Sequence, residues 1–297
     1  VTNMYRLFYS ATAFTSSIDS WVVTNVTTME GMFAFASAFN SSLNSWNVTN
    51  VTNMISMFEQ ATLFNGLVSS WDMTGITDLS EIFAYATSFN QPIGGWNVSG
   101  VTSMYRALYH AEAFDQPLNS WSVSNVTNMD QALGYCEVFN QPLNLWNVAN
   151  VTNMNGMFRS GALFNQDISS WSTANVTNMD DMFHGATVFN SVIDGWNVAN
   201  VTTMKALFQN TTMFNSTLNT WDVSNVTNMY WMFYQADGFN QALNNWDVSS
   251  VTNMNGMFHS TDWFDQDLTG WTVTNVTDHT DFALNGALLP TNEPTWV

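Results

Sequence analysis

Three short clusters of aromatic and cationic side chains are the residues of this chain best suited to specific recognition. Tyrosine, tryptophan and arginine most often dominate the binding energy at protein interfaces, and aromatic rings also stack on the faces of sugars. The candidates for partner contact are Tyr5, Arg6, Tyr9, Tyr105, Arg106, Tyr109, His110, Tyr230, Trp231 and Tyr234. These residue types indicate binding of a protein or a glycan. The alternative interpretation is that the rings only cover neighbouring elements of the fold.

Catalytic signatures are absent from the sequence. There is no His-Glu-x-x-His motif, no glycine-rich phosphate loop and no nucleophile elbow, and Asp180-Asp181 is the only adjacent pair of acidic residues. Asp262, Asp265 and Asp267 do not have the spacing of a known calcium loop. Cys136 stands in an apolar column and is expected to be a buried thiol. The sequence therefore predicts no enzyme activity, no cofactor and no metal site.

The charge balance excludes several kinds of partner. The chain has 4 Lys+Arg against 23 Asp+Glu, a net charge of −19, so nucleic acid and anionic membranes would repel it. No apolar run approaches the ~18–20 residues of a membrane span, so this segment is not expected to insert in a membrane. One cysteine allows no internal disulfide. The chain begins at Val1 without a signal-peptide pattern and is expected to be part of something longer.

A strict repeat of 25 residues must position all of these side chains. Tryptophan occurs at residues 21, 46, 71, 96, 121, 146, 171, 196, 221, 246, 271 and 296. Position 2 of every repeat is Thr, and position 14 is Phe in all but the last copy. Propeller blades need more residues, whereas leucine-rich-repeat coils have ~20–29 per turn. We therefore expect a single repeat solenoid over residues 1–297, with repeats starting at 1, 26, 51 and so on to 276. Residues 276–297 form an atypical C-terminal repeat or cap.

The apolar spacing within a repeat suggests its elements. Apolar residues at positions 1, 4, 7, 8, 11 and 14 match one face of a helix, with the threonine at position 2, such as Thr52, as its N-cap. The Trp-x-Val segment at positions 21–23 alternates and predicts a short strand. The Phe, Trp and Met columns are expected to form the core. The asparagines at positions 15 and 25 are expected to form ladders between neighbouring turns.

The repeat resembles a known one. Residues 151–175, VTNMNGMFRSGALFNQDISSWSTAN, are similar to the 25-residue repeat of mycoplasma-type surface lipoproteins, which belongs with the BspA-like leucine-rich-repeat surface proteins. The resemblance implies a cell-surface or secreted solenoid with roles in adhesion and no catalytic residues. The fold class expected is an α/β solenoid, a right-handed leucine-rich-repeat-like coil of about twelve 25-residue turns, each a short parallel strand plus a helix.

Function is left with three interpretations. The first is a non-enzymatic extracellular or cell-surface protein that acts in adhesion or as a structural scaffold through protein–protein contacts or self-assembly. The second is a glycan-binding adhesin. The third, ice or mineral-surface binding, rests on the regular Thr and Asn columns. Asn-Val-Thr sequons also make formal N-glycosylation acceptors of Asn25, Asn50, Asn125, Asn150, Asn175, Asn200, Asn225 and Asn275.

Overall fold

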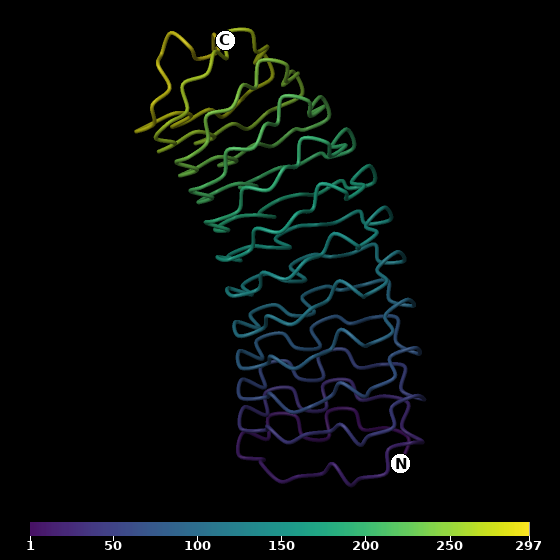
Figure 1. Cartoon of the computed structure of the whole chain (residues 1–297). Coiled ribbons are helices and arrows are strands. Elements are labelled where there is room, and N and C mark those ends of the chain that lie inside the picture. Colours follow the sequence, from purple (N-terminus) through teal and green to yellow (C-terminus); the bar gives the residue numbers. More distant parts are fainter. Residues whose placement is uncertain (297) are drawn as a thin grey trace. The chain divides into compact units, whose positions relative to one another are not determined.

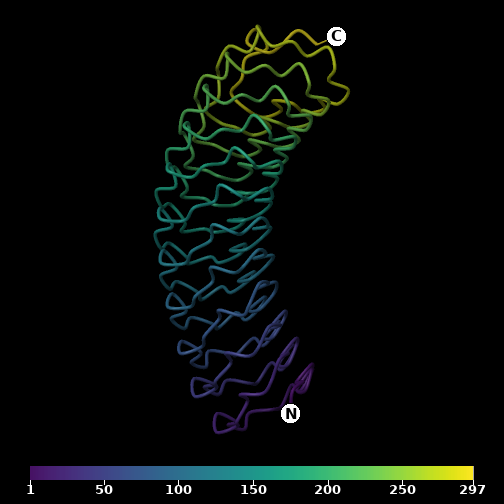
Figure 2. The ribbon, with the colours of Figure 1, turned by 90° about the vertical axis from the view of Figure 1, so that its right-hand side faces the viewer.

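The structure is a computed structural model that describes residues 1–296 and contains two compact units, Val1–Asn150 and Val151–Val297. Each unit is a stack of coils with one coil for each 25-residue repeat (Figure 1). Figure 2 shows the successive coils of each unit from the side. The predicted repeat solenoid is confirmed within each unit. The single solenoid predicted over residues 1–297 stays a prediction.

Residues 1–296 contain no helix and no strand, so the predicted strand and helix in each turn are wrong. Each coil consists of consecutive turns, and single parallel bridges join most coils to the next. The bridges lie at position 3 of the repeat, as between Asn3 and Thr28 and between Asn153 and Asn178. The coils are therefore in register and parallel, but the sheet is reduced to one residue per coil.

Hydrogen bonds between coils replace the helix. The N–H groups of Met4, Arg6 and Phe8 donate to carbonyls 24 residues ahead, in the next coil, at 2.9–3.0 Å. The N–H groups of Leu7 and Tyr9 donate to carbonyls three residues back, at 3.1–3.2 Å. An α-helix would direct all of these N–H groups four residues back. Because every second one is bonded to the next coil, the segment folds as successive turns.

Left-handed residues make this alternation possible. Twenty non-glycine residues and four glycines have positive φ, two in each repeat, at positions 6 and 10. They include large side chains, such as Phe35 (61°), Tyr85 (59°) and Trp231 (54°). Each such residue reverses the local twist, so a right-handed helix cannot continue. Turns that close over three residues still place residues three and four apart on one side, which explains the helix-like apolar spacing.

The hydrogen bonds of the Trp-x-Val segment and of the threonine at position 2 differ from those of the predicted strand and helix cap. The Trp46 N–H closes a turn on the Leu43 carbonyl (3.1 Å), and the Val51 N–H closes the next turn on the Val48 carbonyl (2.8 Å). The hydroxyl of Thr52, like its N–H, donates to the carbonyl of Thr27 in the preceding coil, at 3.3 Å and 2.9 Å. The threonine at position 2 therefore links neighbouring coils by hydrogen bonds and is not a helix cap.

The interior confirms the predicted core of Phe, Met and Trp columns. Phe33 stacks on Phe39 of the same coil at 4.1 Å and on Phe58 of the next at 5.5 Å, and all three are buried. The buried Trp71 donates its indole N–H to the Leu43 carbonyl at 3.0 Å. Each coil thus packs its rings against its neighbours and satisfies the one polar atom of its Trp side chain.

The asparagine ladders are also confirmed. At position 15, the carboxamide oxygen of Asn40 accepts the backbone N–H of Asn65 at 2.7 Å. At position 25, the carboxamide nitrogen of Asn50 donates to the Thr24 carbonyl at 2.7 Å. Both bonds join one coil to the next, so these columns satisfy backbone groups that have no partner within their own coil.

The last repeat departs from the framework. The Trp296 indole N–H donates to a carboxylate oxygen of Glu293 at 3.2 Å, and its ring stacks on His279 at 4.2 Å. That residues 276–297 cap the solenoid stays a prediction, and Val297 lies outside the described residues. Across residues 1–296, no helix has the length and apolar character needed to cross a bilayer.

Candidate interaction surface

The candidate side chains project from the turns at positions 5, 6, 9 and 10. Positions 4, 7, 8 and 11 of the same segment are buried in nearly every coil, whereas the residues between them are exposed or half-buried in most coils. The four positions therefore form a surface of variable residues on a constant framework.

In the first cluster, an arginine lies between two tyrosine rings. The guanidinium carbon of Arg6 is 5.2 Å from the ring centre of Tyr5 and 4.7 Å from that of Tyr9. Tyr9 also packs against Phe35 of the next coil at 5.3 Å. Tyr5 and Tyr9 are 48% and 42% exposed. The cation–π contacts hold the arginine in place and leave much of both rings open to a partner.

The second cluster combines the same motif with an aromatic stack. Arg106 lies 5.1 Å and 4.8 Å from the ring centres of Tyr105 and Tyr109, and its Nε donates to the side chain of Gln131 at 2.8 Å. Tyr109 is buried, and burial, with the neighbouring tyrosines, raises the pKa of Tyr109 to about 12. Tyr105 and Arg106 are half-buried and form its accessible part.

His110 belongs to the packed part of this second cluster. Its imidazole stacks between Tyr85 at 4.8 Å and Tyr135 at 4.0 Å, and Tyr109 meets it edge-on at 4.6 Å. Glu112 lies 3.6 Å from the ring nitrogen. The interpretation that some rings cover neighbouring coils therefore describes Tyr109 and His110.

The third cluster is a half-buried aromatic shelf. Tyr230 and Trp231 stack at 4.6 Å, Trp231 and Tyr234 lie 4.9 Å apart, and Tyr234 stacks on His259 at 4.9 Å. Trp231 extends over Gly256 of the next coil, where a Cβ atom would be only 2.6 Å from the indole. The shelf therefore depends on glycine at this position.

A cavity that sequence reasoning missed adjoins this shelf. It measures about 240 Å³ and is lined by Arg159, Asp181, His184, Lys205, Ala206, Gln209, Tyr230 and Trp231. A carboxylate oxygen of Asp181 lies 3.3 Å from the Arg159 guanidinium and 2.7 Å from Nδ1 of His184. The sequence did place Arg159, His184 and Lys205 at the variable positions 5 and 9. It could not show that Arg159 pairs with a residue at a different position of the next coil.

A half-buried carboxylate, Asp180, precedes the cavity residue Asp181 in the chain. Asp180 accepts hydrogen bonds from the Thr203 hydroxyl at 2.5 Å and from the Lys205 N–H at 2.7 Å. Burial nevertheless raises the pKa of Asp180, and these two hydrogen bonds oppose that shift. The Lys205 bond uses its backbone N–H, and of the two basic side chains only Arg159 is paired with a carboxylate, that of Asp181.

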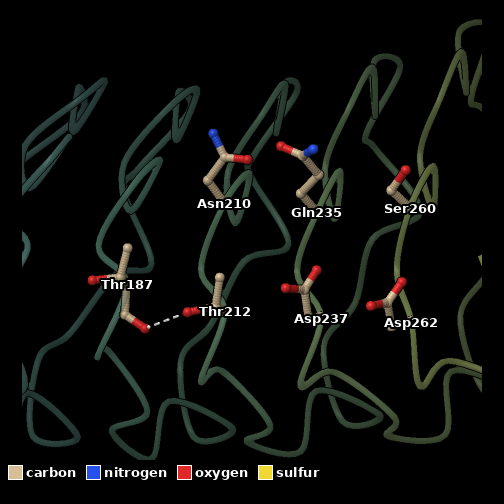
Figure 3. Close-up of a pocket in the computed structure, with 7 residues that line it drawn as sticks. All are labelled: Thr187, Asn210, Thr212, Gln235, Asp237, Ser260 and Asp262. Atoms are coloured by element: carbon tan, nitrogen blue, oxygen red, sulfur yellow. Dashed lines mark hydrogen bonds between the residues drawn. The ribbon is translucent and has the colours of Figure 1, made fainter.

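A longer polar groove lies in the same unit (Figure 3). It measures about 440 Å³, and its walls are two rows of side chains at positions 10 and 12 of successive coils: Thr187, Asn210, Thr212, Gln235, Asp237, Ser260 and Asp262. Burial and the charge of Asp262 raise the pKa of Asp237. Within residues 1–296 no group of three or more His, Cys, Asp or Glu is placed to hold a metal ion.

Exposed apolar side chains form a further column that sequence reasoning did not single out. At position 13, the exposed residues are Leu63, Val138, Leu163, Met213 and Trp263, and Trp263 is 69% exposed. Apolar side chains that are exposed singly are common on protein surfaces, so this position by itself marks no contact surface.

The predicted glycosylation sites lie on an exposed column. All eight sequon asparagines are exposed. The side-chain amides of Asn50, Asn125, Asn150, Asn200, Asn225 and Asn275 donate to a carbonyl of the preceding coil at 2.7–2.8 Å. The amide nitrogen that would carry a glycan is therefore bonded at these six sites, and modification stays a prediction.

Comparisons with known proteins give a family and distant structural likenesses. Solved structures similar to the chain include a leucine-rich repeat protein from Eubacterium ventriosum, at 11% identity and a TM-score of 0.44, with 92% of this chain and 83% of that chain covered. A leucine rich cell surface protein from Faecalibacterium prausnitzii is similar at 12% identity and a TM-score of 0.47, covering 95% of this chain and 81% of that one. No curated protein matches the sequence.

The sequence match extends over nearly the whole chain. The family described as "Mycoplasma protein of unknown function, DUF285" matches residues 1–74, 64–161, 102–215 and 191–289. This match agrees with the resemblance to mycoplasma-type surface repeats read from residues 151–175. The chain belongs to the DUF285 family.

Proposed function

We propose that the chain acts on the cell surface or outside the cell as a non-enzymatic repeat protein, in adhesion or as a scaffold, through protein–protein contacts. The observation that carries this proposal is the concentration of aromatic and cationic side chains on the turns at positions 5, 6 and 9. All four Lys and Arg residues of the chain stand there. Elsewhere the repeat offers mainly Asn, Ser and Thr to the solvent.

The contact residues we propose are those of the three clusters. All of them except Tyr109 are exposed or half-buried, and the buried Tyr109 packs against the half-buried His110 within the second cluster. Similarity to surface-protein repeats favours the location, and a constant framework with variable turns suits a protein that binds by contact.

The test is association of the purified chain with itself and with other proteins. Light scattering and negative-stain microscopy over a concentration series measure self-association, and an array of extracellular-matrix proteins measures adhesion. We expect ordered assemblies or saturable binding, reduced in a Tyr105→Ser, Arg106→Ser double variant and unchanged in Asn147→Ser, which alters an exposed residue at position 22. A chain that stays monomeric and binds no arrayed protein would overturn the proposal.

A further inference from the structure

The cavity beside the third cluster is built from variable residues alone. Its lining comes from positions 5, 6 and 9 of four successive coils, all within the unit Val151–Val297. At about 240 Å³ it is smaller than the ~300–1,000 Å³ of sites for drug-sized ligands, so it fits one small ring.

One wall of the cavity is an aromatic plane held in a fixed orientation. Trp231 is stacked on Tyr230 with an angle of 20° between the rings, and Tyr234 supports it at 4.9 Å. The absence of a side chain at Gly256 lets the indole lie across the next coil. A fixed indole face is an apolar surface that suits the C–H face of a sugar ring.

The remaining walls carry donors and acceptors close together. The Asp181 carboxylate accepts, Arg159 donates, and His184 is bonded to the same carboxylate oxygen at 2.7 Å. Gln209 is only 8% exposed and adds an amide with both a donor and an acceptor. The hydroxyl groups of a sugar both donate and accept hydrogen bonds. A polyol therefore matches these cavity side chains better than a ligand that can only accept or only donate.

The charges of the cavity argue against an ionic ligand. Arg159 and Lys205 are positive, Asp181 pairs with Arg159, and Asp180, which precedes Asp181 in the chain, adds a second carboxylate near Lys205. A carboxylate ligand would compete with Asp181 for Arg159, and an amine would meet Arg159 and Lys205. The whole chain, at −19, would also repel a polyanionic glycan.

We propose that this cavity binds one uncharged pyranose ring of a glycan, with the C–H face of the ring on Trp231 and its hydroxyl groups on Asp181, His184 and Gln209. The inference deepens the proposed function, on which it rests, by naming the chemical class that the third cluster takes. The protein contacts proposed for the first two clusters are unaffected by this inference.

The experiment uses the full chain and a panel of methyl glycosides of neutral hexoses and N-acetylhexosamines, with glucuronic acid and glucosamine as charged counterparts. Saturation-transfer NMR detects binding, and calorimetry measures the affinity. We expect at least one neutral glycoside to bind, with the strongest transfer to the protons on one face of its ring. Trp231→Ser should weaken binding about tenfold or more, and Trp231→Phe should weaken it less.

The matched control is Trp263→Ser, which removes an exposed indole outside the cavity and should leave the affinity unchanged. Circular dichroism of each variant checks that the coils remain folded. Binding that prefers the charged sugars, or that survives Trp231→Ser, would overturn the inference. If no sugar binds while self-association or protein binding persists, this inference fails and the proposed function stands, whereas loss of every interaction refutes both.

Discussion

Gly256 is the residue whose replacement tests the aromatic shelf most directly. In Gly256→Ala the new methyl group would lie 2.6 Å from Cδ1 and 2.8 Å from Nε1 of Trp231, at a residue with a φ of 56°. The indole must move away, because both contacts are far inside the ordinary van der Waals distance. Its stacking on Tyr230 and Tyr234 would then be weakened.

The magnitude follows from three contributions. A left-handed alanine costs about 1–2 kcal/mol, and displacement of Trp231 from its aromatic neighbours costs about 0.5–1.5 kcal/mol. The reduced freedom of the unfolded chain offsets about 0.4–1 kcal/mol. The free energy of unfolding should therefore fall by about 0.5–3 kcal/mol. In a Trp231→Ser background the same substitution should cost less, because only the backbone contribution remains.

Urea unfolding followed by circular dichroism measures the loss, and hydrogen exchange shows whether it is confined to the coils around residue 256. The control is Gly95→Ala, since no atom lies within 4 Å of a Cβ at Gly95 and its φ is not in the left-handed range. That variant should be neutral or slightly stabilised. The reasoning is refuted if Gly256→Ala costs no more than Gly95→Ala, or if its cost is the same with and without Trp231.

Four further measurements test the framework. Trp121→Phe leaves the Ile93 carbonyl without its indole donor and should lower the free energy of unfolding by about 1–3 kcal/mol in a urea titration; no loss would contradict the bond. Because burial raises the pKa of folded Asp180, its ionisation destabilises the fold as pH rises above the usual value of about 3.9, so Asp180→Asn should reduce the stability lost between about pH 4 and pH 7. Spectrophotometric titration should show one tyrosine ionising near pH 12, and its absence in Tyr109→Phe would assign it. The buried Cys136, whose pKa burial raises, should react with a thiol reagent only after unfolding; rapid labelling of the native chain would contradict its place in the core.

The residues of the core could be predicted from the sequence, but the path of the backbone between them could not. The Phe and Trp columns follow from the 25-residue period, because a repeated apolar residue must meet its own copies when coils stack. The helix prediction failed because turns closed over three residues give nearly the same apolar spacing as a helix. The turns differ from a helix in the positive φ at positions 6 and 10 and in the bonds to the next coil, and residues such as Phe35 and Tyr85 give no sign of either in the sequence.

The candidate surface was predictable in its columns and not in its contacts. Position 5 varies between repeats and carries Tyr5, Tyr105 and Tyr230, which is enough to single them out. It could not find the pair Arg159–Asp181, which joins position 9 of one coil to position 6 of the next. Such contacts depend on whether a side chain points toward the preceding or the following coil, and the geometry of the turns sets that direction.

The large left-handed residues give the strongest physical argument that the turns serve a purpose beyond stacking. Glycine adopts positive φ without strain, and four of the residues with positive φ are glycines. In Trp231 and Tyr85 the same left-handed backbone conformation costs about 1–2 kcal/mol each relative to an unstrained one. Their backbone N–H groups are anchored to the next coil, that of Trp231 at 3.0 Å from the Asn255 carbonyl, so the stack can sustain the strain. The framework imposes this conformation in every repeat, on Ser10 and Gln60 as well as on Trp231, so it requires no aromatic residue there and leaves the side chain free to take a role of its own. For Tyr85 that role is the stack on His110, which lies within the fold. For Trp231 it is the wall of a cavity that the framework does not need.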